Sequence, residues 1–287
     1  MRQHFYSRFI TLGGLNLSER IFMTSSIQSI RIQKEPGARL VDDFVVVEEP
    51  LEIRVEGKAL AVTMRTPGHD KELAAGFLFT EGCVDGADDF HAIAHVKDPR
   101  TEGENIVDIR LAAGTRVDPD RLASAERNFY ASSSCGLCGK SSIERVMQHA
   151  EPVRPVDVLD ADLLAALPQK MRAAQEAFES TGGLHAAALF GLDGSLEVLR
   201  EDVGRHNAVD KVLGWRFLQD RVPVDDRILV VSGRAGFELV QKAVMAGIPA
   251  MAAVGAPSSL AVQLAVQSKM QLVGFLKGAH FNRYGIQ

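Results

Sequence analysis

Cys135 and Cys138 are the residues of this chain whose type and spacing are best suited to covalent chemistry. They belong to a Cys-Gly-Leu-Cys-Gly stretch, in which the glycines let the backbone turn tightly and leave the sulfurs accessible. The thiolate is the reactive form of cysteine, and a cation or a helix N-terminus favours it. Lys140 follows the pair, and Ser141-Ser142 begins an expected helix. The motif therefore predicts a reactive centre at the mouth of a loop.

Structural zinc binding and thioredoxin-like redox chemistry are two other uses of a C-x-x-C pair. Structural zinc needs four ligands, usually from a second cysteine pair or from closely spaced histidines. The chain has three cysteines in all, and the nearest following histidine, His149, stands alone. We expect Cys83, the third cysteine, to be a small buried hydrophobe. A serine-rich loop over residues 128–134, expected to be mobile, precedes the pair where thioredoxin-like proteins have a strand. Sulfur chemistry is favoured over metal, and no metal site is predicted.

The composition is that of an ordinary globular protein of 287 residues with a net charge of −5. No block of Lys and Arg suggests nucleic-acid binding. No stretch approaches the roughly 18 apolar residues that span a membrane, and Met1–Ser26 lacks the pattern of a secretory signal. We expect a cytoplasmic protein whose residues 1–26 form a disordered leader, with Met1 or Met23 as its start.

The segment after the leader divides into two regions by pattern. Residues 27–112 predict a smaller α+β portion, and residues 113–160 predict the mobile cysteine loop followed by a helix with Ile143, Val146 and Met147 along one side. In the first region we expect Asp70 to cap a helix that ends at Gly82. The elements expected there are strands at 43–47, 51–55 and 106–111, a turn at 56–58 and a helix at 71–79.

Residues 161–287 predict an α/β domain that binds a cofactor. Apolar runs alternate with helical patterns, which indicates parallel strands joined by right-handed crossovers. The elements expected are helices at 161–178, 207–218, 237–246 and 260–270, a hairpin of strands 185–190 and 196–199 around Asp193-Gly194, and strands at 228–231, 250–254 and 272–275.

The carboxyl ends of the expected parallel strands are where such a sheet binds ligands. Ser232-Gly233-Arg234, Pro257-Ser258-Ser259 and residues 277–280 follow the three strands, and two of these segments carry a cation. Helix N-termini at such an edge suit the phosphates of a nucleotide-like ligand. Glycine and serine are also common turn residues, so an ordinary set of turns is an equal alternative.

Two histidines and a charged loop precede the first of these parallel strands in the sequence. His185 enters an apolar run, which favours a buried, hydrogen-bonded structural role over a site role. We expect Asp202 to cap the following helix or to pair with Arg205. Arg205 and His206 are candidates for a site role that the pattern does not require.

The motifs of this chain, taken in order, resemble those of the formate dehydrogenase accessory family, the sulfur carriers called FdhD. The resemblance covers nearly all of the chain after about residue 30. The motifs that carry it are Thr66-Pro67-Gly68, the stretch 76–82 (GFLFTEG), the stretch 134–140 (SCGLCGK), the stretch 181–185 (TGGLH), the stretch 201–208 (EDVGRHNA), Ser232-Gly233-Arg234 and the stretch 256–259 (APSS).

The resemblance implies a task, a fold and a set of residues. The task is to take persulfide sulfur from a cysteine desulfurase and to pass it to the molybdenum cofactor, a bis-molybdopterin guanine dinucleotide carried as cargo, for formate dehydrogenase. It implies a homodimer with a cytidine-deaminase-like three-layer α/β sandwich and a smaller N-terminal portion. Cys135 would carry the persulfide and Cys138 would assist. The segment expected to contact the cofactor is Phe275, Leu276, Lys277, Gly278, Ala279 and His280, where this sequence departs from the two arginines often found in relatives.

Deaminase activity is not expected, because that chemistry needs a glutamate two residues after a zinc-ligating histidine. Position 187, two residues after His185, is alanine, and the C-x-x-C pair precedes His185 instead of following it. Besides a sulfurtransferase-type carrier, two alternatives stay open. One is a molybdenum-cofactor chaperone that transfers no sulfur, and the other is a thiol–disulfide oxidoreductase.

Overall fold

The computed structural model of the protein describes residues 9–12, 15–18, 21–24, 27–34, 41–97, 104–115, 117, 121–122, 143, 146–147, 150 and 152–284. Cys135, Cys138 and the serine-rich loop over residues 128–134 lie outside this set. Ile143, Val146 and Met147 are helical, and the first two are buried, as their spacing predicts. Within the described residues, no helix has the length and apolar character needed to cross a membrane.

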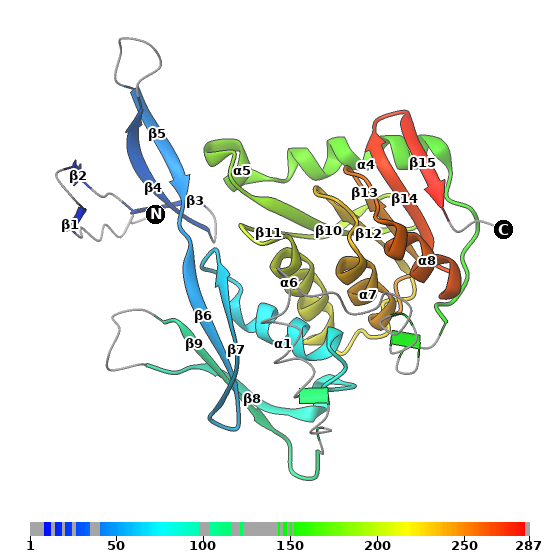
Figure 1. Cartoon of the computed structure of the whole chain (residues 1–287), viewed down its shortest axis with the longest axis horizontal. Helices are drawn as coiled ribbons and strands as arrows, with labels where there is room; N and C mark the ends of the chain where they lie inside the picture. The colour runs from blue at the N-terminus through cyan, green and yellow to red at the C-terminus, as the bar shows by residue number, and fades with distance from the viewer. Residues whose placement is uncertain are drawn as a thin grey trace.

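A six-stranded mixed sheet forms the centre of the molecule (Figure 1). Its strands, in spatial order, are β11 (Leu196–Asp202), β10 (His185–Gly191), β12 (Arg227–Val231), β13 (Ala250–Ala253), β14 (Gln271–Lys277) and β15 (His280–Tyr284). The neighbours β12, β13 and β14 are parallel, as the sequence predicts, and antiparallel strands flank them on both sides. The last strand was not expected: Gly278, at φ +58°, turns the chain back so that β15 covers the edge of β14.

Helices cover both faces of this sheet. On one face lie α4 (Ala161–Ala173) and α5 (Glu176–Thr181), and on the other lie α6 (Arg205–Phe217), α7 (Phe237–Met245) and α8 (Ser259–Gln267) (Figure 1). The single helix expected over residues 161–178 is wrong, because it is interrupted at Ala174-Gln175. The physical reason is Glu201, whose carboxylate accepts hydrogen bonds from the amides of Ala177 and Phe178 and so begins a new helix there.

The N-terminal part of the chain contributes strands and one long helix. A four-stranded sheet has the order β7 (Lys58–Arg65), β6 (Glu49–Val55), β9 (Ile106–Leu111) and β8 (Phe90–His95). The other elements are β1 (Phe9–Leu12), β2 (Leu15–Ser18), β3 (Ile21–Thr24), β4 (Ile27–Lys34), β5 (Val41–Val46), α1 (Asp70–Thr80) and the short 3₁₀ helix η1 (Ala87–Asp89). Strands β1, β2 and β3 fall within the range expected as a leader.

The start of α1 differs from the expectation that Asp70 caps it. The cap residue is His69, which has a φ of +59° and makes no side-chain cap. The Asp70 carboxylate instead receives two hydrogen bonds of 3.0 Å from the guanidinium of Arg65, and both side chains are buried. A bidentate pair of this kind fixes both partners, which explains why Asp70 does not reach the helix amides.

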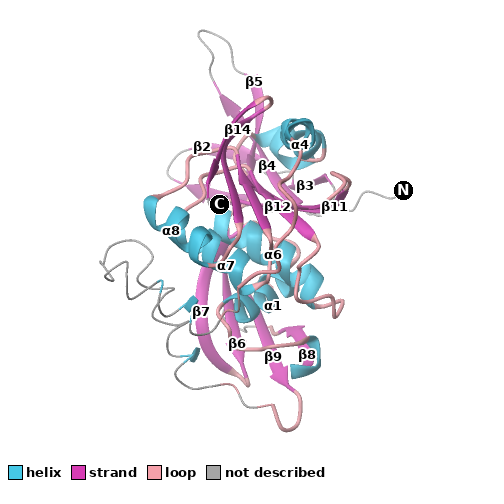
Figure 2. Ribbon diagram, turned by 90° about the vertical axis from the view of Figure 1, so that its right-hand side faces the viewer, coloured by secondary structure: helices cyan, strands magenta, loops and turns pink. Residues whose placement is uncertain are grey.

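The two sequence regions share one apolar core because α1 and α6 are in backbone contact. A Cβ atom on Gly76 would lie 1.9 Å from the carbonyl oxygen of Asp210, and one on Gly214 would lie 1.9 Å from that of Glu72. Figure 2 shows α1, α6 and α7 between the central sheet and the four-stranded sheet. Mixed α/β architecture is therefore confirmed, while the likeness to cytidine deaminases stays a prediction.

We expect Gly214→Ala to lower the free energy of unfolding by about 2 kcal/mol, because the added methyl group would overlap the α1 backbone. Alanine normally stabilises a helix relative to glycine by about 1 kcal/mol, so the expected sign is opposite to that of helix propensity. Urea unfolding measures the effect. Gly86→Ala is the matched control, because a Cβ there meets nothing within 4 Å. Equal unfolding midpoints for the two variants would contradict the close contact.

Candidate anion-binding site

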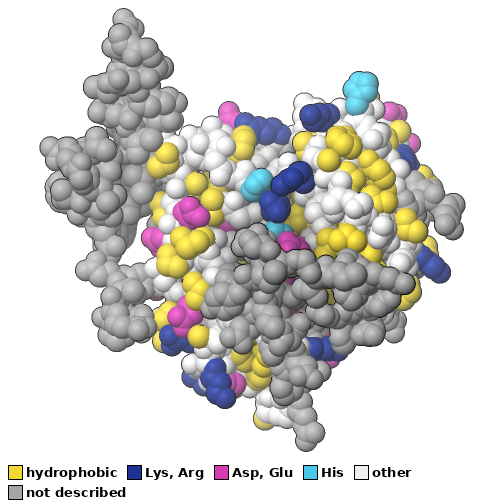
Figure 3. All heavy atoms as spheres, viewed as in Figure 1, with side chains coloured by type: hydrophobic (Ala, Val, Ile, Leu, Met, Phe, Trp, Pro, Cys, Tyr) yellow, Lys and Arg dark blue, Asp and Glu magenta, His cyan; other side chains and the backbone are white. Residues whose placement is uncertain are grey.

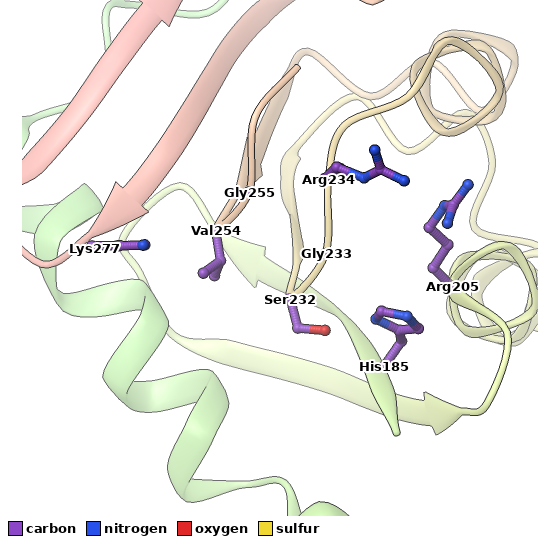
Figure 4. A pocket seen from close by; sticks show the side chains of 8 residues that line it. All are labelled: His185, Arg205, Ser232, Gly233, Arg234, Val254, Gly255 and Lys277. Atoms are coloured by element: carbon purple, nitrogen blue, oxygen red, sulfur yellow. The ribbon is translucent and has the colours of Figure 1, made fainter. Parts of the chain in front are cut away.

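A pocket of about 410 Å³ lies at the carboxyl ends of the parallel strands. Figure 4 shows its lining residues, which come from five parts of the chain. They are His185 at the start of β10, Arg205 at the start of α6, Ser232, Gly233 and Arg234 after β12, Val254 and Gly255 after β13, and Lys277 at the end of β14. The sheet edge predicted to bind a ligand therefore does form a cavity.

The loops that line the pocket are joined to one another by backbone hydrogen bonds. The amide of Gly255 donates to the carbonyl oxygen of Gly233 at 2.9 Å, and the amide of Phe275 donates to that of Gly255 at 3.0 Å. A Cβ on Gly255 would approach the Arg234 Cα to 2.9 Å, so only glycine fits this contact. The pocket floor is thus rigid, and its side chains extend from fixed backbone positions.

Among the residues that the structure describes, three cations and no carboxylate line this pocket. Figure 4 shows Arg205 and Arg234 on one side and Lys277 on the other, and blue side chains gather near the centre of the face in Figure 3. Within the part of the chain that the structure describes, these three side chains form no hydrogen bond or ion pair with another side chain. Cations that line one pocket attract an anion, and phosphate is a group that such donors suit well.

His185 lies against the same floor, and the expectation that it is fully buried is wrong. Its half-buried ring lines the pocket, and a Cβ on Gly233 would be 3.4 Å from its Nδ1 atom. Burial lowers the pKa of His185, and the positive charges of Arg205 and His206 lower it further, while Asp202 acts in the opposite direction. The ring is therefore mostly neutral at pH 7.

Arg205 and His206 are positioned by a buried ion pair directly behind them. The expected pairing of Asp202 with Arg205 is wrong. Asp202 pairs instead with Lys211, at 2.7 Å, and both side chains are almost fully buried. The other contacts of the pair satisfy every polar atom. Asp202 also accepts from the amides of Thr66 and Gly204 and from the Asn207 side chain, and Lys211 donates to the carbonyl oxygens of Thr66 and Glu201.

A second ion pair links the two helices whose N-termini border the pocket. His206 Nε2, in the first turn of α6, lies 2.6 Å from Glu238 Oε2, in the first turn of α7. The hydrogen bond from His206 lowers the pKa of Glu238 despite its partial burial. Arg205 and Arg234 flank this link in sequence, so it helps to fix the distance between their backbones.

The residues predicted to contact a cofactor occupy different environments. Lys277 lines the pocket, whereas Leu276 is fully buried in the core beneath α4. Phe275 is 45% exposed and has a φ of +55°, an unusual conformation for an aromatic residue. Gly278 and Ala279 form the turn into β15, and exposed His280 begins that strand.

Of the other two predicted segments, Ser232-Gly233-Arg234 lines the pocket and Pro257-Ser258-Ser259 does not. Ser258 instead caps α8 by accepting from the amide of Ala261 at 3.2 Å. His185 and Arg205 also line the pocket, although the sequence pattern did not require a site role for either. The sequence features that could have indicated them are the two glycines shortly before His185 and the charged stretch at the start of α6, which contains Arg205. Among the described residues, no cluster of His, Cys, Asp and Glu could hold a metal ion.

The fold and pocket define an α/β protein with a cationic ligand site at the ends of its parallel strands. The sequence matches the FdhD/NarQ family over residues 46–286, and the chain belongs to that family. It is 54% identical over 252 residues to the sulfur carrier protein FdhD of Streptomyces avermitilis, covering 84% of this chain and 87% of the relative. It is 51% identical over 251 residues to the protein of the same name from Mycobacterium tuberculosis, covering 84% and 90%.

The fold also matches a solved structure. This is a crystal structure of a protein from Desulfotalea psychrophila that is provisionally described as a formate dehydrogenase accessory protein. The TM-score is 0.67 at 24% sequence identity, over 89% of this chain and 96% of the other. The match supports the arrangement of elements given above.

We expect Lys211→Met to lower the free energy of unfolding by about 3 kcal/mol, because it leaves the Asp202 carboxylate buried without a counter-charge. Chemical denaturation measures the loss. Lys58→Met, at an exposed position of β7, is the control and should be nearly neutral. Adding Asp202→Asn to Lys211→Met should recover part of the loss, and strictly additive effects would contradict the pairing.

We expect Arg234→Gln and Lys277→Gln each to weaken the binding of inorganic pyrophosphate about tenfold, because each removes one charge-assisted contact. Calorimetric titration at low and moderate salt measures the affinity, which should fall as salt rises. Arg110→Gln, an exposed cation on β9 in the four-stranded sheet, removes the same charge far from the pocket. An equal loss in that control would attribute the effect to net charge and not to the pocket.

Proposed function

We propose that this chain is a sulfur carrier in the maturation of formate dehydrogenase. It takes persulfide sulfur from a cysteine desulfurase onto Cys135 and passes the sulfur to a molybdenum cofactor held as cargo in the cationic pocket. The observation that carries this proposal is the pocket itself, because it supplies an anion site on a chain with one C-x-x-C pair. The names of the relatives at 54% and 51% identity support the carrier role.

The pocket suits the cargo by charge. A bis-molybdopterin guanine dinucleotide carries diphosphate groups, and Arg205, Arg234 and Lys277 are three cations without carboxylate partners among the described residues. The exposed ring of Phe275, two residues before Lys277, offers an apolar face to a flat heterocycle. These residues would bind and orient the cofactor. The cofactor itself would supply the chemistry at the molybdenum atom.

The covalent steps take place at the cysteines. The Cys135 thiolate attacks the outer sulfur of the donor persulfide, so that a new S–S bond forms on Cys135 and the donor leaves as its thiolate. The Cys138 thiolate then attacks the inner sulfur of Cys135 and releases the outer sulfur as sulfide. The two electrons that sulfide carries away come from the two thiols, which end as a disulfide. An external thiol must reduce this disulfide before the next cycle.

We expect the purified protein, incubated with a cysteine desulfurase and cysteine, to gain the mass of one sulfur atom, and Cys135→Ala to gain none. Intact-mass spectrometry under non-reducing conditions measures the gain. Cys83→Ala is the matched control, since Cys83 is the chain's remaining cysteine and is buried. Cys138→Ser should still gain the sulfur but fail to release it as sulfide.

Three other outcomes would reject parts of the proposal. If the parent protein gains no sulfur but binds the cofactor, the chain is a cofactor chaperone. If it gains no sulfur but reduces unrelated disulfides rapidly, it is a thiol–disulfide oxidoreductase. If Cys138→Ser passes sulfur to the cofactor at the parent rate, the release step through a disulfide is wrong.

A further inference from the structure

His185 stands at the pocket wall where a bound anion would meet it. The residue begins β10, and its ring lies close to Gly233, as does Arg205: a Cβ on Gly233 would be 3.4 Å from the His185 Nδ1 atom and 3.9 Å from the Arg205 Cδ atom. Figure 4 shows the ring on the same side of the pocket as Arg205 and Ser232. An imidazole placed among cations at the edge of an open cavity can donate a hydrogen bond to whatever anion they attract.

The charges around His185 come from three neighbouring elements. Arg205 and His206 approach from α6, Arg234 from the loop after β12, and Asp202 is its paired residue on β11. Asp202 is the only carboxylate among them, and its two oxygens already bind Lys211, two backbone amides and the Asn207 amide. His206 is bound to Glu238. The neighbourhood of His185 is therefore cationic, and it adds to the effect of burial in lowering the pKa of the ring.

We propose that His185 contacts the bound phosphate and takes up a proton as the anion binds, so that a fourth cation forms in the pocket only when it is occupied. This inference rests on the proposed function, because it requires the pocket to bind the phosphates of the cargo. The proton is taken from solvent onto the ring, no covalent bond to the ligand forms, and the same proton returns to solvent when the ligand leaves.

The direction of the pH dependence follows from the charges. In the free protein, burial and the nearby cations lower the pKa of His185. A phosphate in contact with the ring favours the charged form and raises that pKa in the complex. Affinity must then increase as pH falls through the pKa of the complex, and it levels off below the pKa of the free protein. Between the two values the affinity changes by up to about tenfold per pH unit.

The test is calorimetric titration with GDP-mannose, a diphosphate diester whose charge is constant between about pH 6 and about pH 8. Because the probe does not titrate, any proton taken up belongs to the protein. Titrations in two buffers of different ionisation enthalpy give the number of protons bound. We expect uptake of a fraction of a proton near neutral pH and several-fold tighter binding at about pH 6 than at about pH 8.

Three variants assign the proton. In His185→Gln, which keeps a hydrogen-bond donor but cannot titrate, uptake should vanish and affinity should no longer depend on pH. His206→Gln removes the other nearby histidine and should keep the uptake. His91→Gln, an exposed histidine on β8, is the remote control. Uptake that persists in His185→Gln, or that disappears in His206→Gln, would overturn the assignment.

The parent protein alone distinguishes failure of this inference from failure of the proposed function. Binding of GDP-mannose without proton uptake would overturn the role of His185 and leave the phosphate site intact. Absence of any binding would overturn both the pocket's role in holding the cargo and the inference that depends on it.

Discussion

The buried ion pair of Asp202 and Lys211 is the interaction on which the rest of the site depends. Both side chains are essentially inaccessible to water, so each is tolerable only because the other is present and because backbone groups complete their hydrogen bonding. The backbone groups come from Thr66 in one half of the chain and from residues 201–204 in the other. A single network therefore fixes the β7–α1 turn, the end of β11 and the start of α6 relative to one another.

The geometry of the pocket therefore depends on residues that are far from its lining residues in the sequence. Arg205 extends from the first turn of α6, and α6 cannot shift without breaking either the ion pair or its contact with α1 at Gly214. The α1 helix in turn is held at its start by Asp70 and Arg65. The N-terminal sheet and α1 thus act as a brace behind the ligand-binding edge, although they contribute none of the residues that line it.

Sequence alone predicted those features that follow from local patterns. The alternation of strands and helices after residue 185 was foreseen, and so was the sheet edge at which Ser232–Arg234 and Lys277 line a pocket, because periodicity and turn chemistry determine both. The surroundings of Asp202 were not foreseen, since they include a contact with Thr66, which lies more than a hundred residues away in the sequence. A motif shows that a charge is present, but packing decides which partner it meets.

The cations that hold the fold together differ from those that line the pocket in whether they have a carboxylate partner. Lys211 and Lys242, both buried, have carboxylate partners, as does Arg200, which makes two hydrogen bonds to Glu72. The pocket cations Arg205 and Arg234 have none within the described residues, although Glu238 lies close enough to bind the adjacent His206. His206 binds that carboxylate directly, while Arg205 affects it only through its charge. The two arginines repel one another, and an anion bound between them would offset that repulsion and so stabilise this edge of the fold.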